Sequence, residues 1–174
     1  EWKKGEKEDG SDCEAFQIAP HSHWNLHCVI LVIQEHEKLV SSTEGMKHAE
    51  KTSPYFLKWS EEAEKDYLEI KKFVLEKDFE MLSKTVEANC LKMHKTCLTS
   101  IPPTLYWSGK TLEILDKIRD WQRGGLRAFF TIDAGPNVVI FCEESSKDSL
   151  FELASKLPYV SPLLTKIGTG PVYF

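Results

Sequence analysis

A single stretch decides how this chain folds: Phe129-Phe130-Thr131-Ile132-Asp133-Ala134-Gly135-Pro136-Asn137-Val138-Val139-Ile140. The aromatic and β-branched residues at both of its ends suit a buried, pleated surface, so each end predicts a strand. Between them, Gly135-Pro136-Asn137 supplies the backbone freedom and the fixed φ angle of a tight turn. The stretch therefore predicts a β-hairpin with the carboxylate of Asp133 at its tip.

The Asp133 carboxylate has two interpretations. An acid at the point where a rigid strand passes into a tight loop is held in place without being desolvated, which suits a general base or a charge partner. An aspartate in a turn also forms hydrogen bonds to its own backbone, which is a structural role only. The stretch by itself leaves both interpretations open.

Length and composition indicate one globular domain. The chain has 174 residues, of which 41% are hydrophobic, and a net charge of −5 without a basic block, which argues against a nucleic-acid partner. The longest apolar run, Cys28 to Ile33, is too short to cross a bilayer, and no secretory signal is visible. Five cysteines without a CxxC pair are typical of reduced thiols in a cytosolic protein. Because the first residue is Glu1 and not Met, we expect a longer parent chain.

The first half of the chain carries a strand signal and a helix start. The apolar run His27 to Ile33 is rich in β-branched residues and predicts a strand covered on both faces. Ser41 and Glu44 have the S-x-x-E spacing of a capping box, so we expect a helix to begin there. Its first turn offers free N–H groups to an anion such as a phosphate, with the Ser42 hydroxyl as an added donor; a plain cap without a ligand is the alternative.

Further helices follow this start. Ser53-Pro54 predicts a cap and a first-turn proline for a long amphipathic helix. Asp78 is expected to cap a helix that packs antiparallel on it, and Trp107-Ser108 to open another that ends at Gly124-Gly125. After the hairpin we expect a helix over residues 149–156 and a strand over 164–167. This order predicts an α+β fold whose antiparallel sheet is covered on one face by a helical layer.

A zinc site is a further hypothesis. Cys90, His94 and Cys97 fall at i, i+4 and i+7 of one predicted helix, so all three project to one side and could ligate zinc. A fourth ligand is not evident. The alternative is two thiols and an imidazole packed in a helix face, with no metal.

In chain order, the sequence resembles the diphosphomevalonate decarboxylase family at a series of motifs: residues 9–18, Ser41-Ser42-Thr43-Glu44-Gly45-Met46, Thr52-Ser53-Pro54, Asn89 with Met93-His94, Pro102-Pro103 with Tyr106, and Asp133-Ala134-Gly135-Pro136-Asn137. The resemblance covers almost the whole chain, and residues 167–171 look like the last strand of the family. Cys13 and Phe16 depart from the residues usual in the family, at positions that we do not associate with catalysis.

The resemblance implies a fold and an activity. The fold would be that of the C-terminal domain of the GHMP kinase superfamily, with residues 1–36 closing an N-terminal ATP-binding domain and residues 37–174 forming the C-terminal domain. The activity would be ATP- and Mg²⁺-dependent decarboxylation of mevalonate 5-diphosphate to isopentenyl diphosphate, in a cytoplasmic homodimer. Asp133 matches the catalytic aspartate of the family, and Ser42 matches a serine that contacts the substrate. The ATP-binding loop would precede Glu1, so no cofactor-binding residue is assigned in this chain.

The decarboxylation implied by the resemblance would give the Asp133 carboxylate a chemical role. Asp133 would accept the proton of the tertiary C3 hydroxyl as that oxygen takes the γ-phosphoryl group, and would stabilise the positive charge that develops at C3 when phosphate leaves. Ser42 would hold an anionic part of the substrate. Two alternatives stay open: a related kinase or decarboxylase that acts on mevalonate with one phosphate or none, and a non-catalytic interaction domain of the same fold.

Overall fold

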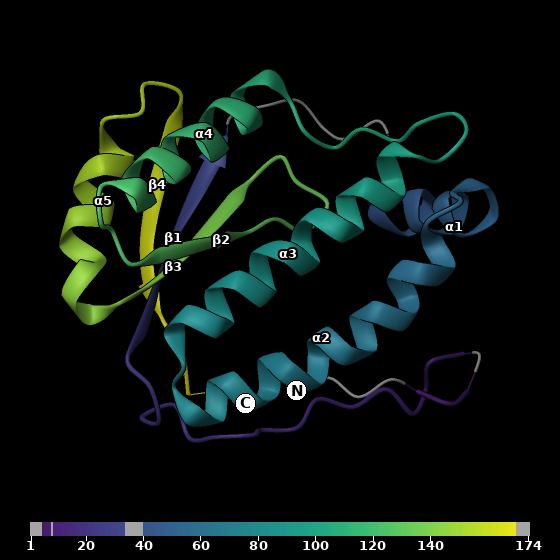
Figure 1. Ribbon diagram of the computed structural model, residues 1–174, viewed down its shortest axis with the longest axis horizontal. Helices are drawn as coiled ribbons and strands as arrows, with labels where there is room; N and C mark the ends of the chain where they lie inside the picture. Colours follow the sequence, from purple (N-terminus) through teal and green to yellow (C-terminus); the bar gives the residue numbers. More distant parts are fainter. Residues whose placement is uncertain (1–4, 8, 34–39, 170–174) are drawn as a thin grey trace, which may run out of the picture.

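The computed structural model describes residues 5–7, 9–33 and 40–169. In chain order the elements are β1 (Leu26–Ile33), α1 (Ser42–Thr52), α2 (Phe56–Glu76), α3 (Phe79–Leu98), α4 (Gly109–Arg123), β2 (Ala128–Thr131), β3 (Val138–Glu143), a 3₁₀ turn (Glu144–Ser146), α5 (Lys147–Ser155) and β4 (Val160–Lys166) (Figure 1). This order confirms the predicted α+β class. No helix among these residues is long and apolar enough to cross a membrane.

The strands form a four-stranded sheet in the order β2-β3-β1-β4, and each neighbouring pair is antiparallel. β1 lies in the middle, where Val29 pairs with Ile140 of β3 on one side and with Leu164 of β4 on the other. The sequence boundary between residues 36 and 37 falls in a segment outside the described residues and stays a prediction. β1 precedes that boundary and is hydrogen-bonded into the same sheet as strands that follow it.

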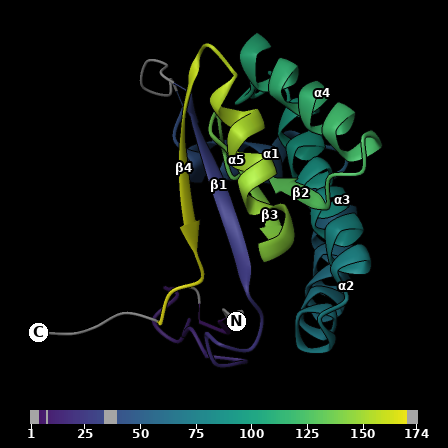
Figure 2. The same cartoon turned by 90° about the vertical axis from the view of Figure 1, so that its left-hand side faces the viewer.

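The prediction that β1 is covered on both faces was wrong for the described residues. Val29 and Leu31 are completely buried, whereas Val32, which points to the opposite face, is 37% exposed. The reason is that the helices pack mainly against one face, and Figure 2 shows α3, α4 and α5 on the same side of β1 and β4. An unbroken apolar run reports strand propensity, but it does not report which face receives the helices.

Two apolar clusters hold the layers together. The larger lies between the covered sheet face and the helices, with Ile114 and Ile118 from α4 and Leu150 from α5 fully buried. The smaller joins the turn between α2 and α3 to the ends of β1 and β2, and it consists of Leu26, Phe73, Phe79, Leu82 and Phe129. Both clusters include β2, so the hairpin strands are fixed from two directions.

The helix starts follow the predicted caps except at α2. Ser41 and Glu44 form the capping box of α1, and Asp78 caps α3 through a 3.0 Å bond from the Met81 N–H. α2 begins at Phe56, because Ser53 ends α1 and uses its hydroxyl differently, accepting from the Tyr55 N–H at 3.3 Å and bonding Thr99 Oγ1 at 2.9 Å. The last helix and the last strand each begin earlier than predicted, at residues 147 and 160.

Candidate active site

The β2–β3 hairpin forms as predicted, with Thr131 opposite Val139 and residues 132–137 in the connection. Gly135 has φ +88°, a backbone conformation that residues with a side chain rarely adopt. The Asn137 Oδ1 accepts a 3.1 Å hydrogen bond from the Ile33 N–H at the end of β1. The connection is therefore tied to the central strand and is not a free loop.

Asp133 lies exposed in this connection, directly after the buried Ile132, which is 2% exposed. Within residues 5–7, 9–33 and 40–169 its carboxylate has no hydrogen-bond partner, so the turn bond considered as the structural alternative is not formed there. Figure 1 shows the connection reaching toward the C-terminal half of α3 and toward α1. A charged group in this position is open to solvent on one side and rigidly mounted on the other.

α3 provides the rigid mount through the residue that precedes Asp133. The Ile132 N–H donates to Cys90 Sγ at 3.3 Å, and the Cys90 thiol lies 3.5 Å from the Ile132 carbonyl oxygen. His94 Nε2 lies 3.1 Å from the same carbonyl and 3.1 Å from Trp107 Nε1. Both α3 side chains are almost completely buried, so Cys90 hydrogen-bonds the Ile132 backbone without competition from water and His94 packs against its carbonyl.

The protonation of His94 follows from these contacts. An indole N–H can only donate, so His94 Nε2 accepts from Trp107 and the neutral imidazole carries its proton on Nδ1. In this tautomer the 3.1 Å approach of Nε2 to the Ile132 carbonyl oxygen is a packing contact and not a hydrogen bond. Burial lowers the pKa of His94, opposed by the carbonyls of Ile132 and Asp133, which keeps the ring neutral at neutral pH. Burial likewise raises the pKa of the Cys90 thiol. The protonated thiol is then the donor to the Ile132 carbonyl, and the contact with Asp133's neighbour involves no ionised group.

Cys90, His94 and Cys97 do not converge on a common point. Cys90 and His94 contact Ile132, whereas the Cys97 thiol lies 3.8 Å from Met46 Sδ of α1. No group of three His, Cys, Asp or Glu side chains with metal-binding geometry occurs in the described part of the chain. The alternative weighed against zinc, thiols and an imidazole packed in a helix face, describes what these residues do.

Ser42 lies exposed in the first turn of α1. The preceding Ser41 hydroxyl accepts from the Glu44 N–H at 3.2 Å, and the Glu44 carboxylate accepts from the Ser41 N–H at 3.2 Å. These bonds to Ser41 lower the pKa of Glu44. Ser42 keeps its hydroxyl free of this capping box and borders a shallow hollow of about 420 Å³ that Met46, Lys47 and others line.

Tyr106 lies between the two predicted site residues, which belong to separate elements. Its hydroxyl donates to the Ser41 carbonyl at 2.9 Å, and its own carbonyl packs against Gly135. The sequence analysis assigned no role to Tyr106, although the residue is among the motifs that carry the family resemblance. The connection of residues 99–108 has no helical or strand periodicity, so no pattern in the sequence assigned this contact to it.

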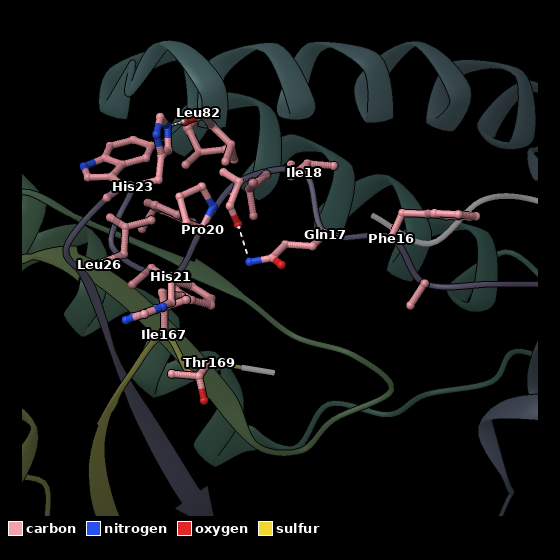
Figure 3. A pocket seen from close by; sticks show the side chains of 18 of the residues that line it. Phe16, Gln17, Ile18, Pro20, His21, His23, Leu26, Leu82, Ile167 and Thr169 are labelled. Atoms are coloured by element: carbon pink, nitrogen blue, oxygen red, sulfur yellow. Dashed lines mark hydrogen bonds between the residues drawn. The ribbon is translucent and has the colours of Figure 1, made fainter. Parts of the chain in front are cut away.

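A larger hollow of about 1090 Å³ lies at the opposite end of the sheet (Figure 3). Its lining is mostly apolar and comes from residues 14–26, the α2–α3 pair, the base of the hairpin and the end of β4. Phe129 and Phe141 are the hairpin residues that reach it, and both lie away from the tip that bears Asp133. The candidate site and this hollow of about 1090 Å³ are therefore separate features.

The sheet order and the helical layer are those of the C-terminal domains of the GHMP kinase superfamily. Residues 28–166 match the family model for the mevalonate 5-diphosphate decarboxylase C-terminal domain, and the chain belongs to this family. It is 33% identical over 157 residues to the diphosphomevalonate decarboxylase of Candida albicans, a match that covers 89% of this chain and 43% of that protein. The chain thus spans about two-fifths of the length of the curated relatives that it matches.

Solved structures agree with this assignment. The mevalonate pyrophosphate decarboxylase from Streptococcus pyogenes superposes with a TM-score of 0.80 at 30% identity, over 86% of this chain and 47% of that chain. A structure described as MDDEF in complex with MVAPP, AMPPCP and magnesium gives a TM-score of 0.81 at 31% identity, over 95% of this chain and 53% of that chain.

Proposed function

We propose that this chain supplies the acid–base carboxylate of an ATP-dependent mevalonate 5-diphosphate decarboxylase, and that Asp133 is that carboxylate. The observation that carries the proposal is the mounting of Asp133: its side chain is exposed and unpaired among the described residues, while the backbone next to it is held by Cys90. A general base needs this combination of access and fixed geometry. Membership of the decarboxylase family supplies the reaction.

In the proposed mechanism Asp133 acts on the C3 hydroxyl of the substrate. A tertiary alcohol is a poor nucleophile, so Asp133 accepts its proton while the oxygen takes the γ-phosphoryl group of ATP. After that proton has passed to solvent, the Asp133 carboxylate stabilises the positive charge that develops at C3 as the C–O bond to phosphate breaks. The bond to the carboxyl carbon then breaks, its electron pair forms the alkene, and CO₂ leaves to give isopentenyl diphosphate.

Ser42 would bind an anionic part of the same substrate. The first turn of α1 has backbone N–H groups and a helix dipole that favour negative charge, and the exposed Ser42 hydroxyl adds a donor. The Glu44 carboxylate is occupied by the capping box and so does not compete for the hydroxyl of Ser42. Ser42 is therefore proposed to bind and orient the substrate, whereas Asp133 is proposed to carry the chemistry.

ATP and Mg²⁺ belong to the same proposal. When bound, they supply the phosphoryl group and neutralise its charge; the solved relative described with AMPPCP and magnesium supports their use in the family. The described residues contain no cluster of carboxylates or imidazoles that would hold the metal by itself. Because the chain spans 43% of the length of the Candida albicans relative, we propose that residues outside this chain contribute to binding ATP and Mg²⁺, and we propose a cytoplasmic homodimer as the working assembly.

The direct test uses the complete protein that contains this chain. ADP formation and CO₂ release are measured with mevalonate, mevalonate 5-phosphate and mevalonate 5-diphosphate. We expect equal amounts of ADP and CO₂ with the diphosphate alone. ADP without CO₂ would replace the decarboxylase by a kinase, release of CO₂ from a less phosphorylated substrate would change the substrate, and ATP binding without turnover would leave a non-catalytic domain of this fold.

A further inference from the structure

The two proposed site residues lie on separate elements, and a two-residue segment contacts both elements. This segment, Tyr106 and Trp107, follows α3 and precedes α4 and is called the brace below. It touches the first turn of α1 with the Tyr106 side chain and the Asp133 hairpin with the Tyr106 backbone and the Trp107 ring. Each contact can be followed atom by atom.

The contact with α1 depends on the hydroxyl of Tyr106 and on a glycine. The Tyr106 hydroxyl donates to the carbonyl of Ser41, the residue directly before Ser42, at 2.9 Å. The ring lies so close to Gly45 that a Cβ atom there would be 1.9 Å from the hydroxyl oxygen and 2.9 Å from Cζ. Burial raises the pKa of Tyr106, so the hydroxyl stays protonated and able to donate. The first turn of α1 is thereby fixed against the brace.

The contact with the hairpin reaches both sides of Asp133. On one side, a Cβ atom at Gly135 would lie 3.2 Å from the Tyr106 carbonyl oxygen and 3.6 Å from Trp107 Cδ1. On the other side, the Trp107 indole N–H donates to His94 at 3.1 Å, and the two rings lie 4.5 Å apart. His94 in turn packs against the carbonyl of Ile132. The brace therefore restrains the residue before Asp133 and the residue two positions after it.

We propose that Tyr106 and Trp107 are positioning residues, which hold the Ser42 end of α1 and the Asp133 hairpin in one fixed arrangement around the substrate. The inference rests on the proposed decarboxylase function for its kinetic consequences, and on the contacts above for its structural ones. A displacement of about 1 Å between a bound substrate and its base can cost up to about a hundredfold in rate. Neither brace residue needs to touch the substrate to have such an effect.

Single substitutions separate the two ends of the brace. Tyr106→Phe removes the hydroxyl that bonds Ser41 and keeps the ring, so we expect KM for mevalonate 5-diphosphate to rise about fivefold with kcat nearly unchanged. Trp107→Phe removes the indole N–H that bonds His94, so we expect kcat to fall about tenfold or more with KM nearly unchanged. The number of ATP molecules bound per chain should stay at the wild-type value in both variants, whereas a loss of folded protein would lower it.

The chain offers a matched control for each variant. Tyr55→Phe removes the hydroxyl of a 39% exposed tyrosine that follows the C-terminal end of α1 and whose ring lies 3.8 Å from Lys95 Nζ. Trp59→Phe removes an indole N–H that has no hydrogen-bond partner in the described part of the chain. Both controls should keep wild-type KM and kcat. If the brace variants behave as their controls do in an active enzyme, the proposal is overturned while the proposed function stands.

Amide hydrogen exchange tests the brace without relying on activity. In the complete protein we expect the peptide containing Gly45 to exchange roughly five- to tenfold faster in Tyr106→Phe, and the peptide containing Ile132 to do so in Trp107→Phe, each for the loss of about one hydrogen bond. Exchange equal to that of the control variants at both peptides overturns the brace. An inactive wild-type protein that still shows the two local accelerations overturns the proposed function and keeps the structural proposal.

Discussion

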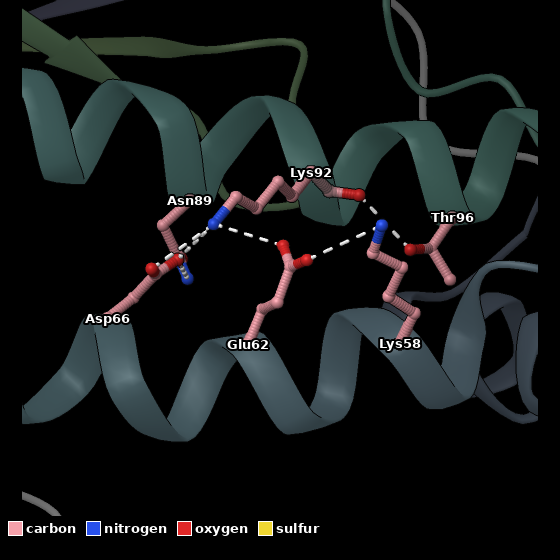
Figure 4. A network of polar contacts seen from close by, with 6 residues as sticks. All are labelled: Lys58, Glu62, Asp66, Asn89, Lys92 and Thr96. Carbon is pink, nitrogen blue, oxygen red and sulfur yellow. Dashed lines mark hydrogen bonds and ion pairs between the residues drawn. The ribbon is translucent and has the colours of Figure 1, made fainter.

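The two faces of α3 contact the hairpin and α2 through different kinds of side chain. Toward the hairpin, α3 presents Cys90 and His94, which are 4% and 3% exposed, neutral, and in contact with a backbone amide and carbonyl. Toward α2, it presents Lys92, whose ammonium group lies 3.1 Å from Asp66 and 3.2 Å from Glu62 (Figure 4). One helix therefore contacts the hairpin connection through neutral, dry groups and contacts α2 through an exposed ion pair. One turn before Cys90, the buried Glu87 carboxylate of the same helix also accepts from the Phe130 N–H of β2 at 3.2 Å and pairs with Arg119.

The neutral contact and the ion pair have different roles: the first positions the hairpin backbone, and the second packs α3 against α2. A buried neutral contact has no water to replace it, so its loss changes the geometry of the hairpin backbone. The Lys92 side chain is 35% exposed, so water reaches its ammonium group and partly screens the ion pair with Asp66, whose side chain is 12% exposed. We therefore expect changes on the hairpin face to affect both stability and the proposed catalytic geometry, and changes on the α2 face to affect stability slightly.

The largest effect on stability is expected from His94→Ala. The substitution empties a site that is 3% exposed and leaves the Trp107 indole N–H without its acceptor, so it should lower the free energy of unfolding by about 3 kcal/mol. Urea unfolding followed by circular dichroism gives this value. A cost no greater than that of Lys92→Met would remove the contrast between the two faces.

The next largest effect is expected from Gly135→Ala at the hairpin. Its φ of +88° and the Tyr106 carbonyl at 3.2 Å from the added Cβ both oppose a side chain, so the cost should be about 2 kcal/mol. Gly109→Ala is the matched control, since a Cβ atom there meets nothing within 4 Å. Urea unfolding of both variants measures the difference, and we expect the lower midpoint for Gly135→Ala. Equal midpoints would show that the hairpin is not held as described.

Acidification should weaken the contact between α3 and the hairpin. Burial lowers the pKa of His94 below the ordinary histidine value of 6.5, so the unfolded chain takes up a proton at a pH where the folded protein does not. The contribution of His94 to stability is then complete above about pH 6.5 and falls as the pH drops below it, by at most about 1.4 kcal/mol per pH unit for one proton. Unfolding measured between about pH 5 and 8 should depend less on pH in His94→Gln than in the wild type. The same pH dependence in both proteins would contradict the buried, neutral imidazole.

The smallest effect is expected from the charged face. Lys92→Met should cost about 1 to 2 kcal/mol, because the buried Asp66 loses its cationic partner but keeps the 3.0 Å bond from Asn89. Adding Asp66→Leu should recover most of that cost, since an apolar pair of similar volume replaces the two charges. A double-mutant cycle by urea unfolding measures the coupling. A coupling energy above the cost of His94→Ala would reverse the comparison.

Local signals in the sequence were sufficient for much of the fold. The hairpin around Gly135, the capping box at Ser41 and the cap at Asp78 each depend on residues a few positions apart, and all three were predicted. The start of α2 was misplaced because the Ser53 hydroxyl has a partner, Thr99, that lies far along the chain. Exact helix starts are therefore less accessible to sequence reasoning than the existence of the helices.

Contacts between residues far apart in the chain could not be predicted from the sequence in the same way. Helical spacing predicted that Cys90, His94 and Cys97 share one side of α3, but it could not identify Ile132 and Met46 as their partners. The same spacing gave α2 a polar side and did not reveal that Asp66 is buried there, 8% exposed, because its cationic partner comes from α3. Periodicity assigns a residue to a face, and only the packed structure assigns its neighbour.

The most direct test of the account concerns Asp133 itself. CO₂ release from mevalonate 5-diphosphate is measured for the complete protein and for Asp133→Asn, with Asp116→Asn, an exposed aspartate on α4, as the control. The unfolding midpoint and ATP affinity are measured on the same samples to establish that each variant is folded. We predict a loss of at least about a thousandfold for Asp133→Asn, equivalent to about 4 kcal/mol of barrier, and wild-type activity for the control. A folded, ATP-binding Asp133→Asn enzyme that keeps its rate within about tenfold of wild type would contradict the proposal that this carboxylate is the catalytic base.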